Sequence, residues 1–124
     1  MKSDRRSHQR FKPPQSGLFI RDVGSAISGW IIDMSMSGLA FDYYPTESLY
    51  LPSFLSIDIS EAEHGEPILH EVSCRTVYDA QVLSENRSFK HGVELRRCGL
   101  AFSHPSEAER AKLSQILAGY QMDH

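Results

Sequence analysis

Apolar and polar residues alternate in short runs along most of the chain, a pattern that favours β-strands over helices. The clearest run covers residues 30–41. One parity of this run carries large apolar side chains: Trp30, Ile32, Met34 and Met36. Apart from Ile31, the other parity carries short polar side chains: Asp33, Ser35 and Ser37. Because successive side chains of a strand point to opposite faces, we predict that the first set packs in a core and the second faces outward.

Six runs of this kind predict strands, and turns rich in Gly, Pro and Ser separate them. They cover residues 18–23, 27–35, 39–44, 55–59, 68–82 and 89–102. In the last run the apolar residues change parity across Arg96 and Arg97. A change of parity inside a strand predicts a β-bulge at that point.

The end of the chain has the pattern of a helix. Ser106 and Glu109 have the spacing of a capping box. Apolar residues follow at helical spacing: Leu113, Ile116, Leu117 and Tyr120. Five or six strands followed by an amphipathic helix predict an all-β dominated fold, a small antiparallel β-barrel that the C-terminal α-helix closes or caps.

The composition is that of a single globular domain: 124 residues, of which 40% are hydrophobic and 23% charged. No apolar run approaches the roughly 20 residues that cross a bilayer, and the N-terminus lacks the pattern of a secretory signal. We therefore expect no membrane insertion and a cytoplasmic location. Cys74 and Cys98 have no paired spacing, and we expect them to be buried, reduced thiols.

The net charge of −3 is unevenly distributed. Residues 1–12 carry five basic side chains and one acidic side chain, a net charge of +4 that leaves −7 for the rest of the chain. We therefore divide the chain into a basic N-terminal arm, residues 1–16, and a barrel domain, residues 17–121. The arm predicts an anionic partner, whereas the acidic domain argues against a broad nucleic-acid surface. A solubilising tail or a nonspecific contact with nucleic acid is the plainer alternative for the arm.

The sequence lacks the usual patterns of catalytic and metal sites. It contains no Gly-x-Ser-x-Gly elbow, no pair of histidines four residues apart on a helix, no Cys-x-x-Cys and no phosphate-binding loop. We therefore expect a binding module rather than an enzyme, with no metal and no cofactor.

Two groups of residues have the chemistry of a guanine-nucleotide site. Arg6 and Arg10 can bracket a compact ligand, because an arginine forks onto phosphate oxygens or onto guanine O6 and N7. Asp33 can accept hydrogen bonds from the N1–H and N2–H₂ edge of guanine, and Ser35 can reach phosphate or ribose. Gly38 allows a base or a backbone to approach closely.

These residues resemble the signature of the PilZ domain family. Arg6-x-x-x-Arg10 is followed by Asp33-x-Ser35-x-x-Gly38, and the run Arg97-Cys-Gly-Leu-Ala-Phe102 is similar to the strand that leads into the family's terminal helix. The resemblance implies a six-stranded antiparallel barrel that binds the bacterial second messenger cyclic di-GMP. It implies that Arg6 and Arg10 hold the phosphates and guanines and that Asp33, Ser35 and Gly38 hold the other edge.

Three further points belong to this interpretation. Arg5 precedes the motif, at a place that in the family influences ligand number, and we predict two cyclic di-GMP molecules per protomer. Arg96 and Arg97 are candidates for an additional contact, or else plain surface arginines.

With no second domain in the sequence, we expect the output to be an unknown downstream protein. The alternatives are a ligand-independent interaction protein with the same fold and a basic-armed nucleic-acid binder.

Overall fold

The computed structural model describes residues 17–25, 27–45, 51–62, 65–82, 89–90 and 93–121. This part of the chain forms eight strands and one helix. In chain order they are β1 (Phe19–Asp22), β2 (Ser28–Met34), β3 (Gly38–Tyr43), β4 (Phe54–Ser60), β5 (Pro67–Gln81), β6 (Phe89–Lys90), β7 (Val93–Glu94), β8 (Arg96–Phe102) and α1 (Glu107–Gln121).

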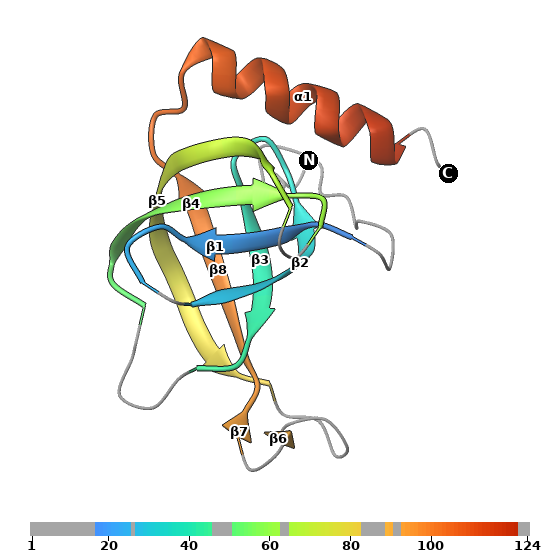
Figure 1. Ribbon diagram of the computed structural model, residues 1–124. Helices are drawn as coiled ribbons and strands as arrows, with labels where there is room; N and C mark the ends of the chain where they lie inside the picture. Colours follow the sequence, from blue (N-terminus) through green and yellow to red (C-terminus); the bar gives the residue numbers. More distant parts are fainter. Residues whose placement is uncertain are drawn as a thin grey trace, which may run out of the picture.

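Six of the strands close into an antiparallel barrel, in the order β1-β2-β3-β8-β5-β4. The strands β6 and β7 pair with each other and project from one end of the barrel, while α1 lies across the other end (Figure 1). The predicted fold class, a six-stranded antiparallel barrel with a C-terminal helix, is therefore confirmed. The predicted single strand over residues 89–102 is instead divided into β6, β7 and β8.

The inside of the barrel is filled by apolar side chains that alternate along the strands. Leu55, Ile57 and Ile59 of β4 are all buried, as their spacing predicts. Leu113 and Leu117 of α1 complete the same core from the end of the barrel. Each such side chain contributes about 1.5–3 kcal/mol by leaving water. The helix is therefore held to the barrel chiefly by its apolar face.

The helix begins with the predicted capping box. The backbone N–H of Ser106 donates to Oε1 of Glu109 at 2.9 Å, and the N–H of Glu109 donates to Oγ of Ser106 at 3.0 Å. Two of the N–H groups that a helix start leaves without partners are satisfied in this way. The side chain of Tyr120, the last residue of the predicted apolar face, lies outside the described residues.

The prediction that Trp30 and Ile32 belong to the core is wrong. Trp30 is 38% exposed, Ile32 is half-buried, and Ile31 is the buried side chain, with 4% exposure. The pairing of β2 with β3 shifts between Ile31 and Asp33, so Ile32 is the extra residue of a β-bulge. Beyond the bulge the parity is reversed, and Met34 faces the core as predicted.

The predicted bulge at Arg96 and Arg97 is also wrong, because both residues pair regularly with β3 and with β5. The pairing of β5 with β8 shifts between Thr76 and Tyr78, which makes Val77 the extra residue. The change of parity in the sequence arises at Leu95, a buried residue between β7 and β8.

We expect the core contact of α1 to dominate its contribution to stability. Replacing Leu113 by Ala should lower the free energy of unfolding by about 2–5 kcal/mol, because it removes a fully buried side chain and leaves a cavity. Ser114→Ala changes the neighbouring exposed position and should alter it by less than about 0.5 kcal/mol. Urea denaturation followed by circular dichroism measures both. Equal midpoints for the two variants would contradict the assigned packing of the helix.

Candidate functional site

The strands β2, β3, β8 and β5 lie side by side and present two rows of outward-facing residues. The first row follows the paired positions Asp33, Ala40, Gly99 and Tyr78. The second row follows the paired positions Trp30, Asp42, Arg97 and Ala80. We call these eight residues the outer face. Ala40 is small, but the ring of Tyr78 lies over Gly99, where a Cβ atom would fall 2.3 Å from Cε2 of that ring. Asp33 stands at the edge of this row.

The side chain of Ser35 is used inside the turn between β2 and β3. Its backbone N–H donates to the carbonyl oxygen of Gly38 at 2.8 Å, and its Oγ accepts from the N–H of Ser37 at 3.1 Å. The two serine hydroxyl oxygens lie 3.0 Å apart and share a hydrogen bond. Ser35 is buried, so it does not stand on the outward polar face that the alternation predicts. Its hydroxyl instead fixes the turn that carries Asp33 and Gly38.

Gly38 is required by the contact between β3 and β8. A Cβ atom at this position would lie 2.1 Å from the carbonyl oxygen of Leu100 and 3.2 Å from Cα of Ala101. Both of these atoms belong to the backbone, which cannot turn aside as a flexible side chain could. The sequence suggests that this glycine allows either a base or a backbone to approach closely. The structure shows a close approach of the β8 backbone.

Arg97 forms a two-pronged ion pair with Asp42 on the second row. Nε of Arg97 donates to Oδ1 of Asp42 at 2.7 Å, and Nη2 donates to Oδ2 at 3.0 Å. The side chain of Asp42 is 7% exposed and that of Arg97 is 43% exposed. The hydrogen bond to Asp42 raises the pKa of Arg97 above its usual value, and the charge of Asp33 acts in the same direction. Sequence reasoning missed Asp42, because nothing local marks it as the partner of an arginine 55 residues away.

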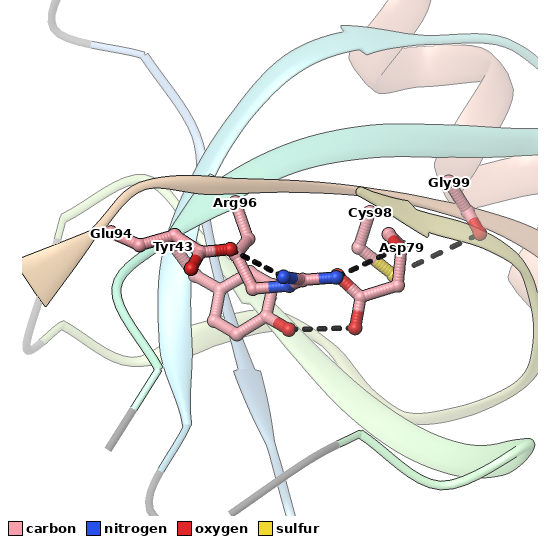
Figure 2. A network of polar contacts seen from close by, with 6 residues as sticks. All are labelled: Tyr43, Asp79, Glu94, Arg96, Cys98 and Gly99. Carbon is pink, nitrogen blue, oxygen red and sulfur yellow. Dashed lines mark hydrogen bonds and ion pairs between the residues drawn. The ribbon is translucent and has the colours of Figure 1, made fainter. Parts of the chain in front are cut away.

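Arg96 lies in a different network, at the end of the barrel away from α1. Figure 2 shows its guanidinium between Glu94 and Asp79, with the hydroxyl of Tyr43 reaching the same aspartate. Nε donates to Oδ1 of Asp79 at 3.0 Å, Nη2 donates to the carbonyl oxygen of Asp79 at 2.9 Å, and Nη1 pairs with Glu94. All three nitrogens of Arg96 are therefore engaged within the protein.

Buried groups in this network and elsewhere in the core have displaced proton equilibria. Burial, together with the hydrogen bond to Asp79, raises the pKa of Tyr43 far above its usual range. Burial also raises the pKa of the Cys98 and Cys74 thiols to about 12. Both thiols are therefore protonated at neutral pH. They pack as small apolar side chains, as their sequence context predicts.

The structure brings together only part of the predicted site. Asp33, Ser35 and Gly38 lie within one hairpin, on the outer face and in the turn next to it. Arg5, Arg6 and Arg10 lie outside the described residues. Within the described ranges, no three His, Cys, Asp or Glu side chains are grouped so as to hold a metal ion. In the same ranges, no helix is both long enough and apolar enough to cross a membrane.

A cavity of about 1010 Å³ lies elsewhere on the barrel, next to β4, β5 and the end of β8. Residues of both charge signs line it, among them Glu71, Arg75 and His104, with Phe54 at its edge. None of the described residues of the predicted nucleotide motif, Asp33, Ser35 and Gly38, lines it, so its size does not make it the nucleotide site.

Comparison with known proteins gives a consistent result. A family model described as the PilZ domain matches residues 4–119. Among curated protein sequences, no match to this chain is found. The solved structure of the PilZ domain with c-di-GMP of YcgR from Escherichia coli is similar, with a TM-score of 0.72 and 13% identity; the match covers 97% of this chain and 94% of the other.

Two further solved structures share the fold over about half of their own length. The Bacillus subtilis inhibitor of motility (MotI/DgrA) has a TM-score of 0.69 and 17% identity, covering 98% of this chain and 53% of that one. The Borreliella burgdorferi PlzA protein in complex with c-di-GMP has a TM-score of 0.57 and 16% identity, covering 94% of this chain and 52% of that one. At these identities the likeness establishes the fold.

The role of Gly38 can be tested by a single methyl group. We expect Gly38→Ala to lower the free energy of unfolding by about 1–3 kcal/mol, because the new Cβ overlaps the backbone of β8. Gly119→Ala is the matched control: a Cβ there meets no atom within 4 Å, and alanine in a helix should raise stability by up to about 1 kcal/mol. Thermal unfolding of both variants gives the comparison. A Gly38→Ala protein as stable as the wild type would show that the two strands do not approach as described.

Proposed function

The chain belongs to the PilZ domain family, and from this membership we propose that it is a receptor for cyclic di-GMP that acts on a partner protein without chemistry of its own. One observation carries the proposal. The family model spans residues 4–119 and so includes both Arg6-x-x-x-Arg10 and Asp33-x-Ser35-x-x-Gly38, with every motif position filled. Two similar structures, those of the YcgR PilZ domain and of PlzA, are complexes with c-di-GMP, which supports the same ligand.

The barrel supplies the fixed part of the proposed site. Asp33 follows the bulge of β2 and pairs with Ala40 of β3, and the buried side chains of Ile31 and Met34 flank it along the strand. A carboxylate on such a strand needs little ordering when it accepts N1–H and N2–H₂ of a guanine. The entropic cost of binding at this edge is correspondingly small.

The arm supplies the charge. Arg5, Arg6 and Arg10 would donate charge-assisted hydrogen bonds to the phosphates and to the other guanine edge, each worth about 1.5–3 kcal/mol. The arm is basic, and the rest of the chain carries a net charge of −7. An anionic ligand bound on the barrel would attract the arm electrostatically, and the arm would then close over the ligand. We propose that this closure changes the surface offered to the partner protein, in the cytoplasm of a bacterium.

Direct binding measurements test the receptor. We expect selective binding of cyclic di-GMP over GTP and short RNA by calorimetry, with affinity reduced at least tenfold in Arg6→Ala, Arg10→Ala and Asp33→Ala. Arg21→Ala is the control, because Arg21 lies on β1 and pairs with Asp58 of β4, 3.5 Å away and off the outer face. Circular dichroism checks that each variant is folded.

The two alternative functions predict different results in the same experiment. Weak, salt-sensitive binding to any polyanion, unaffected by Asp33→Ala, would identify a nucleic-acid binder. The absence of any binding by the folded wild type would identify a ligand-independent interaction protein. Either result would contradict the proposal that the chain is a receptor for cyclic di-GMP.

The number of ligands is tested by the same titrations. We expect saturation at two cyclic di-GMP per chain, because Arg5 adds a third cation and a stacking plane for a pair that carries four phosphates. Arg5→Ala should bind with a stoichiometry closer to one. Clean saturation of the wild type at one ligand per chain would contradict the ligand pair and leave the receptor itself intact.

A further inference from the structure

Two neighbouring arginines of β8, Arg96 and Arg97, differ in how many guanidinium nitrogens remain able to donate a hydrogen bond to a ligand. Arg96 has all three nitrogens engaged, with Asp79 and Glu94, at the end of the barrel. Arg97 points to the outer face and uses Nε and Nη2 on Asp42. Its Nη1 has no hydrogen bond to any residue in the described part of the chain, and its side chain is 43% exposed.

The guanidinium of Arg97 is held in place before any ligand arrives. A two-pronged contact with a carboxylate fixes both the position and the plane of the fork. The carboxylate is itself rigid, since Asp42 lies in the middle of a ladder, paired with Trp30 on one side and with Arg97 on the other. Ordering a free arginine would cost rotamer entropy, and most of that cost is already met here.

Arg97 and Asp33 belong to one continuous surface. Ala40 and Asp42 are successive outward residues of β3, and Gly99 and Arg97 are successive outward residues of β8. Between Asp33 and Arg97 the surface thus carries Ala40, which is small and 4% exposed, and Gly99, over which the ring of Tyr78 lies. The charge of Asp33 is felt at Arg97, where it helps to raise the pKa of the guanidinium.

The charge of this surface favours a base over a phosphate. Asp33 and Asp42 are two anions against the single cation Arg97, so the local charge is negative and disfavours a phosphate group. A guanine is uncharged and has complementary edges: O6 and N7 accept hydrogen bonds, while N1–H and N2–H₂ donate them. An arginine and a carboxylate on one face, with the ring of Tyr78 between them, match these two edges.

We propose that Arg97, positioned by Asp42, is a further ligand-binding residue that donates to the O6 and N7 edge of a guanine of the bound nucleotide. The inference rests on the proposed function and assigns a division of labour within it. The outer face adds contacts to one guanine, and the arm keeps its proposed contacts with the phosphates and with the guanine edges left to it. Arg96 takes no part in binding.

Substitutions in the Arg97–Asp42 pair, and in a control pair away from the outer face, form the first test. We expect Arg97→Ala and Arg97→Lys each to weaken cyclic di-GMP binding at least fivefold, because lysine keeps the charge but lacks the planar fork. Arg97→Lys also guards against misfolding, since it leaves a cation beside Asp42. Asp42→Asn should weaken binding less, by loosening the fork. Arg21→Ala and Asp58→Asn remove a different arginine–aspartate pair, between β1 and β4, and should leave affinity within twofold.

A ligand analogue identifies the contact itself. Replacing guanine N7 by a CH group, in 7-deaza cyclic di-GMP, should weaken binding to the wild type several-fold and have no further effect on Arg97→Ala. Asp42→Asn should show a reduced response to the analogue, which a purely structural role of Asp42 would not produce. An equal loss in the wild type and in Arg97→Ala would overturn the contact with N7.

Salt dependence separates the base from the phosphate. A phosphate contact would lower the slope of log affinity against log salt by about one in Arg97→Ala, whereas a base contact leaves it nearly unchanged. The lower slope would therefore also overturn the proposal. Wild-type affinity retained by Arg97→Lys and Arg97→Ala would defeat this inference alone. Failure of the wild type to bind cyclic di-GMP would contradict both the proposed receptor function and the role inferred for Arg97.

Discussion

The closure of the barrel depends on a single long strand. β5 runs for 15 residues and pairs with β4 along its first half and with β8 along its second. At Cys74 and Arg75 it is paired with both neighbours, so the sheet turns a corner there. Register shifts on either side of this point accommodate the bend, and Glu71, in the first of them, has a φ of 50°. Every other strand pair of the barrel takes its place from the corner that β5 makes.

Closure gives the outer face its rigidity. β3 and β8 are paired without a register shift over six positions, and the ion pair between Asp42 and Arg97 crosses this ladder. In the described ranges, every buried side-chain nitrogen and oxygen has a hydrogen-bond partner. A surface built in this way has little freedom to adapt, so a ligand must fit it as it stands.

The sequence is informative where a pattern is local and fails where a pattern depends on a partner strand. The capping box of Ser106 and Glu109 needs only residues three apart, and the structure confirms it. The burial of Trp30 was predicted wrongly, because alternation shows parity but not the extra residue that reverses it. Arg96 and Arg97 are identical in type and adjacent, and the partners that distinguish them include two distant aspartates, Asp79 and Asp42, that no local pattern identifies.

The alternation of inward and outward residues along β3 and β8 has a consequence for how such a protein can evolve. Phe41 and Cys98 fill the core, while their neighbours Asp42 and Arg97 face outward. In the proposed receptor, mutations of Asp42 or Arg97 would redirect ligand preference, whereas mutations of Phe41 or Cys98 would erode folding, on different codons of the same short segments. Selection could then explore new small-molecule specificities at one set of positions while the other set keeps the scaffold intact. Gly38 is the exception, because the same residue serves the proposed site and the packing of β3 on β8.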